Sequence, residues 1–535
     1  MTPALVQRRM EGTDRDRTEQ LGLPPGFRRF LMPLLSTFEP HRAILLAARA
    51  RSLAAAHAGT MPGYLARSQA RTAPWKIELP EWALDQRNQI TGPADNPKLL
   101  VAMCNTDDPG CMPDGEDSIT VNWDHVRAAQ ENTVAAIKGT LTWADPATGH
   151  VQAIRPSPQV IYYRPRGLKL TESHALAGPS ISASIFDLAM VFYQTAAERR
   201  AAVADPEAQR KLCFYIPKIE SAEEAGWWSN LIAAMEEAID IPVGITRVMF
   251  LIESLPAAYQ VEEILHAARR HVIGLNLGRW DYMASLLHFK LADSGWILPD
   301  RNTIPHDMPF FQNIRARLVD VCHRRGALAI GGMTALFPDR KDPALNQRAL
   351  DRLAIDKRNE AVMGFDGAWT GHPDQHDVAI AQFPAPNQIH QTHPEAPEHP
   401  DLTPAPTSSP AEGHISVAGT KDAVRTVIEY RFGVLAGLGA RLIKGVDQQG
   451  NAIGGFMEDL ATDRIYRLMI AQRVRHSVAT RDGTRITQGL VTLMFHEALE
   501  QILKEHREVP EFMAIEAGYR RARALSEEMI RRGDF

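Results

Sequence analysis

The chain of 535 residues is too long for one hydrophobic core, so we expect about two to four domains. Apolar residues make up 44% and charged residues 23%, which is the balance of an ordinary globular protein. The formal net charge of -5 is small for this length and gives no general attraction to nucleic acid or to acidic membranes, so we expect neither as a partner.

Cysteine usage and apolar stretches indicate the compartment. The absence of C-x-x-C spacing argues against a disulfide framework or a cysteine zinc site and is typical of a reducing compartment. Two arginines interrupt the stretch 43–57, and charges interrupt the N-terminus where a signal peptide needs an apolar core. We therefore expect a cytoplasmic protein without a membrane span. The cysteines are Cys104, Cys111, Cys213 and Cys322.

Composition divides the chain into four regions. Residues 1–95 are rich in Arg, Ala and Leu with helical spacing, and we interpret them as an N-terminal helical clasp. In residues 96–383, short apolar runs alternate with amphipathic helical stretches. Residues 384–415 are dense in proline and predict a linker or extended surface segment, whereas 416–535 have helical periodicity almost throughout and predict a helical domain.

The middle region contains eight candidate strands, most of them followed by polar or glycine-rich residues and then a helical stretch. This alternation predicts βαβ units and a parallel sheet. Eight strands in this length favour an α/β fold with a closed (β/α)8 barrel over an open sheet. The candidates are 98–103, the run around Cys111, 159–164, 213–218, 247–252, 272–277, 327–332 and 365–370.

Charged side chains follow most of the candidate strands. A barrel brings the carboxyl ends of its strands to one mouth, where active sites form. Several carboxylates on one rim would repel one another without a cation. In chain order the rim residues are Glu116, Asp117, Arg166, Lys218, Glu220, Glu253, Asp281, Gly331, Gly332 and His372.

Glu253 and Asp281 are the strongest candidates for metal ligands on this rim, because they follow adjacent candidate strands and their carboxylates could share one ion. Hard oxygen ligands without a nearby His or Cys cluster favour Mg²⁺ over zinc or copper. A magnesium ion keeps open positions for substrate oxygens and polarises a carbonyl group as a Lewis acid.

Residues 274–282 read GLNLGRWDY, which resembles the malate synthase signature GLN-x-G-x-WDY. Further matches occur in the same order and with similar spacing over roughly residues 73–505, and they are closest to the shorter, A-type form. They are PRG at 165–167, PKIES at 217–221, LIE at 251–253, CHRRGA at 322–327, GGM at 331–333, DG-x-W at 366–369, HP at 372–373, PNQ at 386–388 and MED-x-AT at 457–462.

The resemblance implies a cytoplasmic enzyme of the glyoxylate bypass that joins acetyl-CoA to glyoxylate in a Claisen condensation and then hydrolyses the thioester to malate and CoA. It implies Asp459 as the base that removes a methyl proton, although an Asp in this position is also a common helix cap. Arg166 matches the arginine that stabilises the enolate oxygen, and its alternative role is an ion pair with a carboxylate of the rim.

The resemblance also implies the surroundings of the substrates. Glu253 and Asp281 match the direct Mg²⁺ ligands, with Glu116 and Asp117 as partners through water. The segment Gly278, Arg279, Trp280 and Asp281 would bind the glyoxylate carboxylate through its backbone amides. Lys218 and Glu220 support the site.

The sequence departs from the family pattern at several points. Leu168 and Lys169 stand where Trp-His is usual, Arg270 precedes His271 in place of an acidic or amide residue, and Ala284 stands where Phe is usual. None removes a charged group that the chemistry needs. Two alternatives remain open: a malyl- or citramalyl-CoA lyase-like enzyme on a similar barrel, and a divergent paralogue without catalysis.

Overall fold

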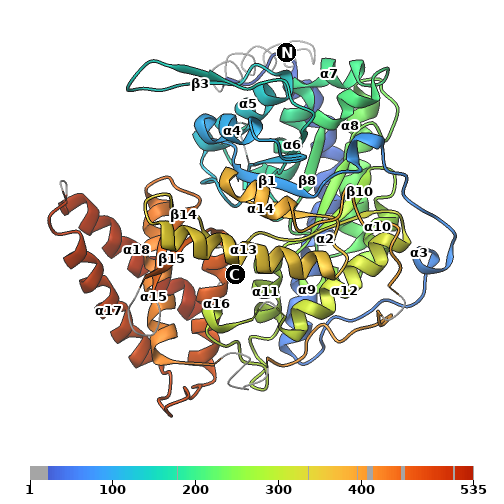
Figure 1. Ribbon diagram of the computed structural model, residues 1–535. Helices are drawn as coiled ribbons and strands as arrows, with labels where there is room; N and C mark the ends of the chain where they lie inside the picture. The colour runs from blue at the N-terminus through green and yellow to red at the C-terminus, as the bar shows by residue number, and fades with distance from the viewer. Residues whose placement is uncertain are drawn as a thin grey trace, which may run out of the picture.

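A computed structural model describes eight segments of the chain, and Figure 1 shows them as a barrel with a second group of helices beside it. The N-terminal residues 1–21 of the expected clasp and residues 407–413 of the expected linker lie outside the described residues. The described segments are 22–176, 179–305, 307–334, 336–393, 396–406, 414–446, 452–509 and 512–533.

Eight parallel strands form the barrel in the order β11-β10-β9-β8-β5-β2-β1-β13, and a bridge between Ile330 and Gly367 joins the two ends. This confirms the predicted (β/α)8 architecture. The strands are β1 (Asn88–Pro93), β2 (Gly110–Asp114), β5 (Val160–Tyr163), β8 (Cys213–Ile216), β9 (Val248–Ile252), β10 (Val272–Leu277), β11 (Leu328–Ile330) and β13 (Ala368–Thr370).

Side chains alternate between two apolar layers along each strand. In β9, Met249 and Leu251 belong to the cluster inside the barrel, whereas Val248, Phe250 and Ile252 pack outward against the helices. Successive strand residues point to opposite faces, and both faces are buried here, so the strands read as continuous apolar runs. This burial of both faces is why short apolar runs in the sequence identified most of the strands.

The first strand of the barrel differs from the prediction. Residues 98–103 are helical, within α4 (Pro97–Cys104), because the Asn96 side chain accepts a hydrogen bond from the Leu99 amide and Pro97 occupies the first turn. The prediction of a strand there was wrong, and β1, which begins at Asn88, takes its place. The barrel therefore begins before residue 96.

Helices cover the outside of the barrel. The long N-terminal helix α2 (Phe27–His57) lies against α6 and α8, and its Phe38 carbonyl accepts a hydrogen bond of 3.1 Å from the indole of Trp227. The other helices of this part are α3 (Gln69–Thr72), α5 (Trp123–Lys138), α6 (Ala183–Gln194), α7 (Ala196–Ala201), α8 (Ala222–Ala238), α9 (Leu255–Ala258), α10 (Val261–Ala267), α11 (Arg279–Phe289), α12 (Pro309–Arg324), α13 (Pro343–Val362) and α14 (His376–Ile380).

The C-terminal part is helical, as predicted, and also contains a hairpin that the periodicity did not reveal. Its β15 pairs with β14 on one side and with β12 (Leu336–Phe337), which follows barrel strand β11, on the other. The C-terminal part therefore shares a separate three-stranded sheet with the segment that follows β11. Its elements are α15 (Val417–Leu435), β14 (Arg441–Val446), β15 (Ala452–Glu458), α16 (Leu460–Arg475), α17 (Gln488–Glu505) and α18 (Phe512–Arg532).

The described part of the proline-rich segment lies on the protein surface and contacts the barrel. Tyr282 donates a hydrogen bond of 3.1 Å to the Leu402 carbonyl, and Trp296 donates one of 3.1 Å to the Pro404 carbonyl. The Leu402 side chain is fully buried. In the described residues, no helix is long and apolar enough to cross a bilayer.

Gly419 allows the N-terminus of α15 to approach Asp300 closely, and a Cβ there would lie 2.2 Å from the carboxyl carbon. Asp300 accepts a hydrogen bond of 2.6 Å from Ser416 and pairs with Arg473 at 2.8 Å, so it links barrel and C-terminal helices.

We expect Gly419→Ala to lower the free energy of unfolding by about 1–3 kcal/mol through overpacking, measured by urea denaturation. The control Gly489→Ala, in open space early in α17, should leave it unchanged or slightly raised; equal effects would contradict the argument.

Candidate active site

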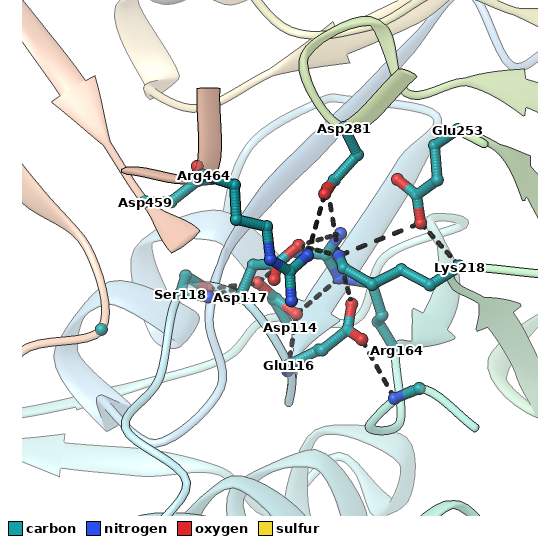
Figure 2. Close-up of polar contacts among 12 residues, drawn as sticks. Asp114, Glu116, Asp117, Ser118, Arg164, Lys218, Glu253, Asp281, Asp459 and Arg464 are labelled. Carbon is teal, nitrogen blue, oxygen red and sulfur yellow. Dashed lines mark hydrogen bonds and ion pairs between the residues drawn. The ribbon is translucent and has the colours of Figure 1, made fainter. Parts of the chain in front are cut away.

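Carboxylates gather at the barrel mouth where the strands end (Figure 2). Asp114, Glu116 and Asp117 follow or end β2, Glu253 follows β9, and Asp281 lies in the first turn of α11 after β10. All five side chains are less than a tenth exposed. The structure thus brings the predicted pair Glu253 and Asp281 to one place together with the predicted Glu116 and Asp117.

The ammonium group of Lys218 lies among these carboxylates. Its Nζ is 3.0 Å from Glu116 Oε2, 2.5 Å from Asp117 Oδ2, 3.0 Å from Asp281 Oδ2 and 4.0 Å from Glu253 Oε1. The backbone amide of Lys218, whose φ of 53° is left-handed, donates a hydrogen bond of 2.6 Å to the same Glu253 oxygen. Lys218 therefore holds four carboxylates in place, and its supporting role stays a prediction.

Two arginines complete the charged cluster, and sequence analysis identified neither. Arg164, directly after β5, forms a two-pronged contact with Asp114 at 2.6 and 2.5 Å and lies 3.6 Å from Asp117. Arg464 comes from α16 of the C-terminal part and lies 3.1 Å from Asp281 Oδ1. The signal for Arg164 was present in the sequence, since the Arg-Pro-Arg run carries two arginines at this strand end.

The predicted catalytic arginine, Arg166, points elsewhere. Its guanidinium contacts Asp187 at 2.8 and 2.7 Å and Glu172 at 3.0 Å, and only 1% of the residue is exposed. Arg166 does not line the cavity at the barrel mouth, whereas Arg164 does. The structure thus gives Arg166 the buried ion pair that sequence analysis kept as its alternative, although with Asp187 and Glu172 instead of a rim carboxylate.

Asp459 caps the N-terminus of α16 and also faces the cavity. Its side chain accepts a hydrogen bond of 3.2 Å from the Thr462 amide, and the Thr462 hydroxyl accepts one from the Asp459 amide. Burial, with Asp117 and Asp281 nearby, raises the pKa of Asp459 to about 7. Capping and a place in the cavity are therefore compatible for this carboxyl group.

Negative charge exceeds positive charge in this cluster. Burial, opposed by the Lys218 charge and reinforced by the neighbouring carboxylates, raises the pKa of Glu116 to about 7 and that of Glu253 to about 8. Asp117 Oδ1 is buried without a hydrogen-bond partner among the described residues. A divalent cation would relieve this excess.

The paired carboxylates at the barrel mouth are hard oxygen donors of the kind that hold a divalent cation. In the described residues, no group of three or more His, Cys, Asp or Glu side chains is arranged to hold a metal ion. Magnesium is commonly held by one or two carboxylates together with water and substrate oxygens. Glu253 and Asp281 supply such a pair.

A cavity of about 720 Å³, here called the large cavity, opens at this cluster. The predicted segment Gly278, Arg279, Trp280 and Asp281 lines it. Gly278 is needed because a Cβ there would lie 2.5 Å from Glu253 Oε2. Farther from the cluster the wall includes Leu99 of α4, Phe337 of β12 and the connecting residues Asp95, Asn96, Arg340, His372 and Gly437.

Glu220 lies at the edge of the site. Its carboxylate is 3.5 Å from Arg49 of α2, and its backbone amide donates a hydrogen bond of 2.7 Å to Glu224. It does not line the large cavity. A supporting role for Glu220 stays a prediction.

Comparison with known proteins identifies relatives over most of the chain. The family model for the malate synthase TIM barrel domain matches residues 160–403, and that for the malate synthase C-terminal domain matches residues 414–532. Malate synthase A of Escherichia coli (strain K12) is 34% identical over 89% of this chain and 87% of its own. A malate synthase of Streptomyces clavuligerus is 37% identical over 86% and 84%, and one of Myxococcus xanthus is 32% identical over 96% and 92%.

The raised pKa of Glu253 predicts that Glu253→Gln stabilises the protein in the absence of metal. The folded protein holds the Glu253 carboxyl at a pKa near 8, above its ordinary value of 4.5, so stability is lost as pH rises between these values. We expect the neutral variant to unfold at a higher temperature than the wild type without metal, with little gain near pH 5 and the full gain above pH 8. Added Mg²⁺ should raise the unfolding temperature of the wild type only. A variant destabilised at every pH would contradict the predicted charge excess.

Proposed function

The chain belongs to the malate synthase family and is an enzyme, and we propose that it condenses acetyl-CoA with glyoxylate and releases malate and CoA, as in the glyoxylate bypass. One observation carries the proposal beyond the family: Asp459, Arg164, Glu253 and Asp281 all line the same large cavity. These groups are a base, a fixed positive charge and a pair of metal ligands, which is the set that an enolate condensation requires.

Asp459 is the proposed base. A carboxylate with a pKa near 7 accepts a proton from the acetyl methyl group more readily than an ordinary aspartate. The methyl carbon then forms a bond to the aldehyde carbon of glyoxylate, and the aldehyde oxygen takes up a proton. Water subsequently cleaves the thioester, giving the malate carboxylate and the free thiol of CoA.

Arg164 is the proposed charge beside the enolate oxygen. It is 6% exposed and lines the large cavity, and Asp114 fixes its guanidinium with two contacts. A charge held in place before the reaction stabilises a developing oxyanion without reorganisation. Arg166 then serves as a buried anchor that joins the 165–167 turn to α6 through Asp187.

The family is metal-dependent in general terms, and we propose Mg²⁺ held by Glu253 and Asp281. When bound, the ion supplies Lewis-acid polarisation of the glyoxylate carbonyl. Gly278 precedes α11 without a side-chain cap, so the amides that begin this helix are suited to the glyoxylate carboxylate. Glu116 and Asp117 support the pair through Lys218.

The large cavity is the proposed site of acetyl-CoA. Its volume of about 720 Å³ suits a long ligand, and its outer wall offers the cation of Arg340 and apolar side chains such as Leu99 and Phe337. The proposed base, Asp459, belongs to the C-terminal domain of residues 416–535. We therefore propose that this domain completes the site, whose other groups come from the barrel of residues 96–383 together with β1. Four unpaired, buried cysteines support a cytoplasmic location.

Thiol release tests the reaction. We expect purified protein to release free thiol from acetyl-CoA only when both glyoxylate and Mg²⁺ are present, and Asp459→Asn to lose this activity by roughly a hundredfold or more, because the base is removed while the amide oxygen still caps α16. Free malate identifies a synthase. An intact acyl-CoA product would indicate a lyase-like enzyme, and no turnover by folded wild-type protein would refute the proposal.

A second experiment distinguishes the roles of Arg164 and Arg166. Arg164→Gln should lower kcat by roughly a hundredfold while the KM for acetyl-CoA stays near the wild-type value, because the charge acts on the transition state. Arg166→Gln should chiefly lower the unfolding temperature, since Asp187 and Glu172 lose their buried partner. A well-folded Arg166→Gln protein with the larger loss of kcat would return the catalytic role to Arg166.

A further inference from the structure

A separate cavity of about 650 Å³, here called the C-terminal cavity, lies where the loop 300–303 meets the C-terminal helices. The first turns of α15, one residue of α16 and the middle of α17 form its other walls, and α15 and α17 pack against each other beside the barrel (Figure 1). Among the described residues, none lines both this cavity and the large cavity. The candidate active site therefore does not account for it.

The C-terminal cavity has a buried floor and an exposed rim. Arg301, Tyr466 and Met494 line it and are at most 5% exposed. Asn302 of the loop and Gln501 of α17 also line it and are exposed. The cavity is thus open to solvent on one side, and its volume is in the range of sites that bind small molecules.

Part of the wall is apolar. Met494 and Ala498 of α17 are four residues apart and therefore lie on the same face of the helix. Tyr466 adds an aromatic side chain whose hydroxyl already accepts a hydrogen bond of 2.9 Å from Arg301. These three side chains offer a surface for the apolar body of a ligand.

Five of the six charged side chains that line the C-terminal cavity contact an opposite charge. These contacts fix the charged groups in place and neutralise them in pairs. The pairs are Asp300 with Arg473 at 2.8 Å, Arg301 with Glu458 at 2.8 Å, Lys421 with Glu497 at 2.8 Å, and Arg425 with Glu429 at 2.8 Å and Glu505 at 2.6 Å.

Asp422 is the sixth charged side chain. Its Oδ2 accepts a hydrogen bond of 3.3 Å from Asn302, and among the described residues no cation forms an ion pair with it. Burial first, and then the charge of Glu458, raises the pKa of Asp422 to about 6, against the opposing charges of Arg301 and Arg425. The carboxyl group is therefore mostly ionised at neutral pH, and a cation beside it would reduce the cost of burying its charge.

Carboxylates also outnumber cations when the partners are included. Among the described residues, six carboxylates and four cations either line the C-terminal cavity or form one of these pairs. The N-terminus of α15 does not reverse this balance, because Asp300 already covers it and accepts a hydrogen bond of 2.6 Å from Ser416. The carboxylates are Asp300, Asp422, Glu429, Glu458, Glu497 and Glu505, and the cations are Arg301, Lys421, Arg425 and Arg473.

We propose that the C-terminal cavity binds a small organic cation, a primary ammonium group on an apolar body, with the ammonium group beside Asp422 and the body against Met494 and Tyr466. Such a ligand contacts the loop 300–303 and the C-terminal helices together. It therefore stabilises the attachment of the C-terminal part, next to the buried pair of Arg301 with Glu458. This inference goes beyond the proposed function and does not depend on the reaction.

Calorimetry with benzylamine tests the preference for a cation. We expect the wild-type chain at neutral pH to bind benzylamine roughly tenfold more tightly than benzyl alcohol, which has the same apolar body without the charge. Asp422→Asn should weaken benzylamine binding by roughly tenfold and leave benzyl alcohol binding unchanged, because only the charge is removed. Glu500→Gln is the matched control: Glu500 is exposed on α17 and does not line the cavity, so this variant should match the wild type.

Ala418→Trp tests the space independently of the charge. Ala418 lines the C-terminal cavity and is exposed, so a larger side chain occupies the cavity without disturbing a packed core. We expect this variant to weaken the binding of benzylamine and benzyl alcohol alike, by roughly fivefold or more. Benzylamine should raise the unfolding temperature of the wild type more than that of either variant, and the temperatures without ligand check that all variants fold.

The outcomes decide the inference without any measurement of turnover. Equal binding of benzylamine and benzyl alcohol by the wild type would overturn the preference for a cation, and so would unchanged benzylamine binding in Asp422→Asn. Unchanged binding of both probes in Ala418→Trp would place them outside this cavity and overturn the site. A wild type that binds neither probe would overturn it as well. The release of thiol from acetyl-CoA decides the proposed function separately.

Discussion

The contact of the Lys218 ammonium with four buried carboxylates is the constraint on which the barrel mouth depends. Without that cation, Glu116, Asp117, Glu253 and Asp281 would lie close together in a poorly hydrated space, and burial of unpaired charge is costly. Its single positive charge does not balance them, and burial, reinforced by the neighbouring carboxylates, keeps the pKa values of Glu116 and Glu253 raised despite Lys218. A site with excess negative charge is prepared for a divalent cation, and it also favours the protonated form of a nearby carboxyl group such as Asp459.

The same charge excess connects the two parts of the molecule. Arg464 of α16 reaches Asp281 at 3.1 Å, and Asp459 caps the N-terminus of the same helix (Figure 2). The attraction between Arg464 and the barrel mouth thus also fixes the position of Asp459, the proposed base. Two further buried pairs, Arg473 with Asp300 and Arg301 with Glu458, hold α15, β15 and α16 against the loop after α11. The contacts that join the C-terminal part to the barrel therefore lie next to the proposed catalytic groups.

The division of space around the carboxylate pair follows from the fold. A closed barrel places Glu253 and Asp281 at one mouth, the C-terminal part covers one approach to them, and α2 covers another. The N-terminal helix, which packs against the barrel through Phe38 and Trp227, acquires in this way a place beside the site.

The sequence by itself determined the barrel, the helical C-terminal part and most of the charged groups at the mouth, because doubly buried strands are continuous apolar runs and strand ends lie at a fixed place in a barrel. Only the tertiary structure decided the rest. Residues 98–103 are as apolar as a strand, yet the Asn96 cap and burial of one side make them a helix. Arg164 and Arg166 are indistinguishable in sequence, and only the position of Asp187 on α6 shows which one is turned away from the cavity. Arg464 carries no local signal, because its partner Asp281 lies 183 residues earlier and becomes a neighbour only when α16 docks against α11.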